Sequence, residues 1–362
     1  MATIQSPADL QTPAPARKEV GEYPADSLRF DWLSVILSGW FLAGLFLDGW
    51  AHNHIAELET FFTPWHAVLY SGFFAVAVLV GVTQYRNVTR GYTRMRALPR
   101  GYWLSLVGVV IFFVGAGGDM LWHVIFGIEQ NVEALFSPTH LLLATGAILF
   151  LTGPLRAAWG RPTAQGWRDL FPAILSLLML FSFFTFFTQY SNLFGNPGVL
   201  VGFAPEGGGY YVNTTAVSYE LIPAALTVGA LLFALRRWQL PFGAVTLMLT
   251  VNALLMMLMR FDFASPFWRT IPAAALAGLF ADVLLWRLRP SVQNVGALRM
   301  VAFVVPVALF LLTFAALTMT NPRGLWWPIH MWLGVPFVAG AVGLGLSFLV
   351  APPSLPAEEI PD

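Results

Sequence analysis

The chain has 362 residues, of which 57% are hydrophobic and only 10% carry a charged side chain, and its formal net charge is zero. Soluble domains carry about 25% charged residues, so this composition excludes an ordinary soluble protein and predicts a polytopic membrane protein. The zero net charge gives no support for nucleic-acid binding. The absence of cysteine excludes disulfides, thiolate metal ligands and cysteine nucleophiles.

The predicted elements begin after a tail. Residues 1–31 are polar and rich in Pro and Ala, which predicts a disordered cytoplasmic tail and not a cleaved signal peptide. Apolar stretches of about 20 residues, the length needed to cross a bilayer, then follow. We count ten of them, at residues 32–52, 64–83, 102–124, 138–156, 170–190, 216–235, 241–259, 267–286, 300–319 and 328–350.

The predicted fold class is therefore all-α, a polytopic integral membrane bundle of about ten transmembrane helices in the lipid bilayer. Residues 32–156 form its first four helices, which contain an internal repeat described below. Residues 157–350 form six further helices, and residues 351–362 form a second disordered tail.

The distribution of basic residues predicts the orientation in the membrane. All but three of the 19 Lys and Arg residues fall in the first tail or in the loops after even-numbered spans, the exceptions being Arg260, Arg269 and Arg323. The positive-inside rule then places both termini in the cytoplasm. The expected location is the plasma membrane or inner membrane of the cell. All six histidines fall at the extracytoplasmic face.

One motif occurs twice within residues 32–156. Each copy reads G-x3-D-x3-H, a gap, and then E-x2-F-[ST]-P-x-H-x4-[ST]-G, with a gap of six residues in the first copy and nine in the second. Ionisable residues at membrane depth are costly and therefore suggest function. The equivalent ionisable pairs are Asp48 and Asp119, His52 and His123, Glu59 and Glu133, and His66 and His140.

The spacing of this motif predicts a metal site at the end of each hairpin. An Asp and a His four residues apart lie on one face of a helix. The following Ser or Thr and Pro predict the N-cap and first position of the next helix, which places His66 and His140 in its first turn. The helix dipole disfavours imidazolium there and so favours the neutral, metal-binding imidazole.

The roles that we predict divide the motif into ligands and supporting acids. Glu59 and Glu133 are expected to orient a histidine N–H or to accept a proton, whereas Glu129 breaks the repeat and is expected at a solvated loop position. Two metal arrangements are open: each hairpin holds its own ion, or both hairpins contribute ligands to one dinuclear centre. The alternative without a metal is that Asp–His hydrogen bonds only fix the helix ends. The predicted ligands are Asp48, His52, His66, Asp119, His123 and His140.

The donor types restrict the metal. Imidazole and carboxylate without thiolate suit copper, zinc, iron or manganese. Several methionines near the outer helix ends, among them Met256, Met257 and Met259, would favour Cu(I), although methionines in apolar helices more commonly fill cores. Haem would need two histidines that face each other across helices, and the neighbouring carboxylates fit a cation better. Copper is our first expectation, with zinc or iron as alternatives.

The D-x3-H pattern, followed by a second His at the start of the next helix, resembles the metal-binding part of the C subunit of copper membrane monooxygenases. These are the particulate methane and ammonia monooxygenases. The resemblance covers the first four spans and implies a copper site on extracytoplasmic helix ends. The positions that match are Asp48, His52 and His66, and again Asp119, His123 and His140.

We therefore expect an extracytoplasmic-face metalloprotein that performs copper-dependent redox chemistry on a small or lipid-soluble substrate. Other membrane subunits or an extracytoplasmic electron donor are the expected partners. The alternatives are a membrane zinc hydrolase with a Glu as base, a metal transporter or sensor, and a non-enzymatic scaffold. Glu220 and His330 are possible additions to the site, while Asp282 is expected to be a surface charge paired with Arg287 and Arg289.

Overall fold

The computed structural model describes residues 23–353 except 56–61, 128, 130–131, 202–208, 321 and 323. The described residues are helical apart from short connections and one isolated bridge between Val201 and Leu325. Eight helices are long and apolar enough to cross a membrane. They are α1 (Leu28–His54), α2 (Pro64–Thr89), α3 (Trp103–Phe126), α7 (Gly166–Phe187), α8 (Gly209–Leu235), α10 (Thr270–Leu288, preceded by a 3-10 turn), α11 (Val295–Thr318) and α12 (Ile329–Val350).

The remaining two predicted spans correspond to less regular helices. Helices α5 (Pro138–Leu151) and α6 (Gly153–Trp159) are bent by 41° at their junction, which fits a broken span or a re-entrant loop. Helix α9 (Ala244–Arg260) is a shorter apolar helix. A single turn, α4 (Glu133–Phe136), precedes α5. The prediction of a multi-pass helical membrane protein is confirmed, while the count of ten crossings stays a prediction.

The predicted tails differ from the structure at one boundary. Helix α1 begins at Leu28, so the residues just before position 32 belong to the first helix and not to the tail. Asp31 is buried there, where its carboxylate accepts a hydrogen bond from the Tyr102 hydroxyl at 2.7 Å and pairs with Arg161. The rest of the first tail to residue 22, and the second tail from residue 354, lie outside the described residues.

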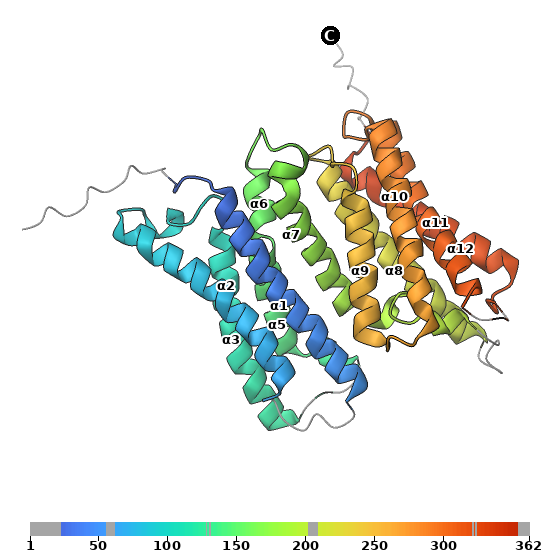
Figure 1. The fold of residues 1–362 in the computed structure, drawn as a ribbon, viewed down its shortest axis with the longest axis horizontal. Coiled ribbons are helices and arrows are strands. Elements are labelled where there is room, and N and C mark those ends of the chain that lie inside the picture. Colours follow the sequence, from blue (N-terminus) through green and yellow to red (C-terminus); the bar gives the residue numbers. More distant parts are fainter. Residues whose placement is uncertain are drawn as a thin grey trace, which may run out of the picture.

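The helices form two groups that α1 and α7 join (Figure 1). Helix α1 packs along α2, and α3 packs along α5, so that two antiparallel hairpins lie side by side in the N-terminal group. Helix α1 also contacts α7 and α9, which connects these hairpins to the C-terminal group of α7–α12. We call the end of the bundle that carries the α1–α2 and α3–α5 turns the histidine end.

The glycines of the repeated motif lie where the helices of each hairpin approach most closely. A Cβ on Gly44 would lie 2.7 Å from the Cα of Leu69, and one on Gly72 would lie 2.6 Å from the Cα of Phe41. In the second hairpin, a Cβ on Gly146 would lie 2.6 Å from a backbone nitrogen of α3. Small residues permit such close helix packing within a membrane, so the motif specifies the hairpin as well as its polar groups.

Four phenylalanines, one from each helix of the two hairpins, fill the space between them. Phe41 and Phe112 occupy equivalent positions of the two motif copies, and their rings meet edge to face with centroids 5.4 Å apart. Phe73 stacks on Phe112 at 4.4 Å, and Phe150 contacts Phe41 at 4.9 Å. This contact between equivalent residues is what two similar hairpins packed about a common axis would make.

The prediction for Asp282 is wrong. Its side chain is buried on α10 and accepts hydrogen bonds from the backbone N–H groups of Val245 and Thr246, at 3.1 and 2.9 Å, and from the Thr246 hydroxyl at 2.6 Å. Arg287 and Arg289 are exposed. The first N–H groups of a helix have no partner within that helix, so the carboxylate is held by the start of α9 and needs no basic side chain.

A segment of turns and two short 3-10 helices, residues 188–201, enters the C-terminal group between α7 and α8. Pro223 interrupts the hydrogen bonding of α8 because proline has no N–H, and the carbonyl freed on Tyr219 accepts the N–H of Leu193 at 3.2 Å. Asn192 and Leu193 are fully buried. Irregular backbone at membrane depth requires such internal partners.

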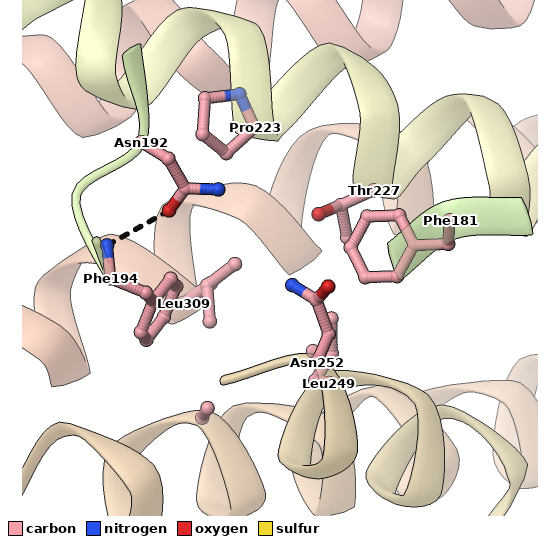
Figure 2. A pocket seen from close by; sticks show the side chains of 9 residues that line it. Phe181, Asn192, Phe194, Pro223, Thr227, Leu249, Asn252 and Leu309 are labelled. Carbon is pink, nitrogen blue, oxygen red and sulfur yellow. Dashed lines mark hydrogen bonds between the residues drawn. The ribbon is translucent and has the colours of Figure 1, made fainter. Parts of the chain in front are cut away.

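This segment closes one side of a small cavity, about 10 Å³, which has room for roughly one water (Figure 2). Asn192 and Asn252 line it, and each amide oxygen already accepts a hydrogen bond, from the Phe194 N–H and the Thr185 hydroxyl respectively. Those bonds orient both amide nitrogens toward the cavity (Figure 2). The apolar core of the C-terminal group therefore contains one small cavity lined by two amide side chains.

Candidate metal centres

Each hairpin turn places its histidines as the sequence predicts. Asp48 and His52 lie in the last two turns of α1, and His66 lies in the first turn of α2. The Thr63 hydroxyl caps α2 by accepting the backbone N–H of His66 at 3.1 Å, and Pro64 is the first helical residue. The second copy repeats this cap, since the Ser137 hydroxyl accepts the His140 N–H at 3.4 Å. The local part of the prediction is confirmed.

The first hairpin brings its three predicted ligands together. The Oδ2 atom of Asp48 lies 3.8 Å from His52 Nε2 and 3.6 Å from His66 Nε2. One ligand atom from each of the three side chains lies within 4.8 Å of the others. We call this group site A.

The second hairpin forms the same group, which we call site B. Asp119 Oδ2 lies 3.5 Å from His123 Nε2, and Asp119 Oδ1 lies 3.4 Å from His140 Nε2. The three side chains again offer ligand atoms within 4.8 Å of one another. The structure therefore places the two triads of the motif in separate hairpins, each complete by itself.

The helix caps also orient the histidine rings. The Nδ1 atom of His66 lies 3.0 Å from the Thr63 hydroxyl, and that of His140 lies 2.7 Å from the Ser137 hydroxyl. A hydroxyl oxygen has two lone pairs and can accept both the backbone N–H and the Nδ1–H. In that tautomer the lone pair of Nε2 points toward the carboxylate and is available to a cation. The Ser or Thr of the motif thus serves both the helix and the site.

The acids outside the triads differ from the prediction. Glu59 lies outside the described residues, and Glu133 begins α4 with an exposed side chain, so the catalytic role predicted for both stays a prediction. Glu129 instead lies beside the site: its Oε2 is 3.3 Å from His123 Nδ1, and its other oxygen accepts the Trp122 indole N–H. The sequence feature that could have indicated Glu129 is the longer gap in the second copy of the motif. The extra residues allow the turn to bring Glu129 back to His123.

The two sites are neighbours. Asp48 interacts electrostatically with Asp119, and His52 with both His123 and His140. Two carboxylates that repel each other favour bound cations, because each cation removes part of the repulsion. Site A and site B therefore fit one ion each and remain close enough to influence one another.

The other candidates from the sequence do not join the triads that the described residues form. His330 lies exposed in the first turn of α12, and Glu220 is fully buried within α8 in the C-terminal group. Met256, Met257 and Met259 are completely buried on α9, which fits core packing. The expectation of copper therefore depends on the histidines and aspartates alone.

Comparison of this chain with known families, curated proteins and solved structures identifies no similar protein. No family model matches the chain, and no curated protein or solved structure is significantly similar to it. The fold defines the protein as a multi-pass helical membrane protein with two clusters of two histidines and one aspartate. The resemblance to the monooxygenase C subunit stays an expectation from the motif.

Proposed function

We propose that the protein is an integral membrane metalloprotein that binds one transition-metal ion in site A and one in site B. The observation that carries the proposal is the spacing of the ligand atoms. An ion that holds tetrahedral ligands at about 2.1 Å keeps them about 3.4 Å apart. The Asp-to-His distances in the two sites run from 3.4 to 3.8 Å.

The same distances weigh against a purely structural role. A hydrogen bond between a ring nitrogen and a carboxylate oxygen would have a length of about 2.7 to 3.2 Å. The described carboxylate–imidazole pairs of both triads are longer than this, from 3.4 Å upward, although the rings point at the carboxylate. The separations therefore fit side chains that share an ion better than side chains that hydrogen-bond directly.

The number of ligands favours a catalytic site. Catalytic metal centres combine three protein ligands with an open position for water or substrate, whereas structural centres are closed by four. Two imidazoles and one carboxylate suit copper, zinc and iron. We propose copper-dependent redox chemistry on a small or lipid-soluble substrate at the extracytoplasmic face, with an electron donor or other membrane subunits as partners. When bound, the metal would supply the electron transfer, and this chain's residues hold and orient it.

Transport is a second candidate, because the C-terminal group has two features of transporters. Glu220 is completely buried near the middle of α8, and neither of its oxygens has a hydrogen-bond partner among the described residues. The irregular segment at residues 188–201 lies beside it, with Leu193 bonded to Tyr219. Transporter sites combine ionisable groups and interrupted helices within the membrane.

Metal analysis of the detergent-purified protein tests the proposal. We expect about two ions per chain in the wild type, about one in His52→Ala and in His123→Ala, and none in the double variant. His330→Ala is the matched control and should keep both ions. Equal, near-zero metal in the wild type and the double variant would contradict the proposal.

The identity of the metal then separates the candidate functions. Copper with an EPR signal that disappears on reduction supports redox chemistry, and stoichiometric zinc without a signal supports a hydrolase. Metal flux in proteoliposomes that is lost in Glu220→Gln, with both ions still bound, supports transport.

The cysteine-free chain permits a direct test of the membrane orientation. Phe263, at the histidine end, and Met95, at the opposite end, are both strongly exposed. In intact cells a membrane-impermeant maleimide should label Phe263→Cys and spare Met95→Cys. The reverse pattern would place the sites on the cytoplasmic side.

A further inference from the structure

Site A and site B have the same ligands, but the protein encloses them differently. In site A the side chain of His52 is 36% exposed and that of Asp48 is 12% exposed. In site B the equivalent His123 is 8% exposed and Asp119 is 2% exposed. The second histidines differ less and in the opposite direction, at 17% for His66 and 24% for His140, so the difference in solvent access lies at the aspartate and the first histidine.

The ring of the first histidine is supported differently in the two sites. The Nδ1 atom of His123 has the Gly127 carbonyl as a hydrogen-bond partner at 3.2 Å, and the Glu129 carboxylate lies beside it as an ion-pair neighbour at 3.3 Å without a hydrogen bond to it. Within the part of the chain that the structure describes, the polar contact of the His52 side chain is with Asp48 alone. A carboxylate on the far nitrogen of a ligand histidine raises its basicity and fixes its orientation.

The aspartates differ in the same direction. Asp119 Oδ1 accepts a hydrogen bond from the Thr139 hydroxyl at 2.8 Å. The residue equivalent to Thr139 in the first copy is Trp65, whose side chain has no hydroxyl. Site B thus has both its Asp and its first His held in place before any ion arrives, and the cost of ordering them on binding is smaller.

We propose that the two sites have different duties: site B holds a tightly bound resident ion, and site A holds an exchangeable ion that meets solvent and substrate. This inference depends on the proposed function, since it assumes that both triads bind metal. A buried, preorganised site releases its ion slowly. A site with an exposed first histidine offers its open position to incoming molecules.

Chelator competition on the purified full-length protein loaded with Cu²⁺ tests this division. We expect the wild type to lose about half of its copper quickly and the other half slowly. His52→Ala should show only the slow phase, and His123→Ala only the fast phase. With one equivalent of Cu²⁺, the EPR spectrum of the wild type should match that of His52→Ala.

A variant that keeps every ligand isolates the support of site B. Glu129→Gln should speed the slow phase by about 10-fold, the lower end of the effect of altering the groups behind a ligand histidine, because it removes the negative charge beside His123 Nδ1 but keeps the Gly127 acceptor. Asp262→Asn is the control, because it removes an equally charged, largely exposed carboxylate at the same end of the bundle. The slow phase should not change in that variant.

The outcomes separate this inference from the proposed function. Two bound ions that leave at one rate, or a Glu129→Gln variant that behaves like wild type, would overturn the division of duties and leave the metalloprotein proposal intact. A wild type that binds no Cu²⁺ or Zn²⁺ would overturn both. Circular dichroism and gel filtration of each variant exclude misfolding as the cause.

Discussion

The two hairpins and the C-terminal group handle polar side chains in opposite ways. Helices α1, α2, α3 and α5 carry the two Asp–His–His triads at one end, where Asp48 and Asp119 each lie near two imidazoles. The C-terminal group places Asn252, Glu220 and Asp282 inside the bundle. Groups at a helix end are solvated when no ligand is bound, whereas groups at depth must find partners within the protein.

This contrast explains why the hairpins are the better candidate for reversible binding. Water reaches site A through the partly exposed His52, and site B through His140, which is 24% exposed, so each triad has one histidine that solvent can contact. In the C-terminal group Asp282 is fixed by the start of α9, and the amides of Asn192 and Asn252 face a cavity with room for about one water. Those groups shape the bundle, whereas the hairpins hold the candidate ligand groups. Four variants or conditions test this separation.

The largest effect is expected from widening a hairpin. In Gly72→Ala the new methyl group would lie 2.6 Å from the Cα of Phe41, so α1 and α2 must move apart. We expect a loss of about 1 to 3 kcal/mol in stability, and loss of the ion of site A. Gly81→Ala on the same helix is the control, because nothing lies within 4 Å of its Cβ position. Melting curves and metal analysis measure both results, and equal behaviour of the two variants would contradict the prediction.

A comparable loss of stability without loss of metal is expected in the C-terminal group. Asp282→Ala removes the acceptor for three donors at the start of α9. Each buried donor left unpaired costs about 1 to 3 kcal/mol of stability. Because some of the three donors will find other acceptors, we expect a total loss of stability of about 2 to 3 kcal/mol. Thermal melting in detergent measures the change. If the copper content fell with it, the two groups would not be separable.

Acid should empty the hairpins before it affects the fold. A metal binds neutral imidazole, and an ordinary imidazole has a pKa of about 6.5, so protons compete with the ion increasingly as the pH falls below that value. We expect bound metal to decrease between about pH 7 and pH 5, with unchanged helical circular dichroism. Equilibrium dialysis at several pH values measures the loss. An apparent metal affinity that does not change between about pH 7 and pH 5 would argue against histidine ligands.

The smallest effect is expected from Glu220→Gln. Neither oxygen of Glu220 has a partner among the described residues, so the substitution breaks no ion pair or hydrogen bond seen there. We expect a change in stability within about 1 kcal/mol, and two ions still bound. Melting and metal analysis check both. Loss of an ion would show that Glu220 belongs to the metal centres and that the division between the two groups is wrong.

The sequence determined the features that depend on neighbours along the chain. Its apolar stretches predicted a helical membrane protein, and the D-x3-H spacing placed Asp48 and His52 on one face of a helix. The Thr63 and Ser137 caps, and with them the positions of His66 and His140, followed from the same local rules. Such features depend on contacts three or four residues apart, which periodicity and capping preferences report directly.

Only the tertiary structure decided the contacts between distant segments. The sequence left open whether the two triads pool their ligands, and the packing of each helix pair completes one triad per hairpin. It gave Glu133 the role beside a histidine, but the turn brings Glu129 to His123. It paired Asp282 with Arg287 and Arg289 near the end of the same helix, but the first N–H groups of α9 bind that carboxylate. These outcomes depend on where a chain segment folds back and which helix ends meet, and no local pattern encodes that.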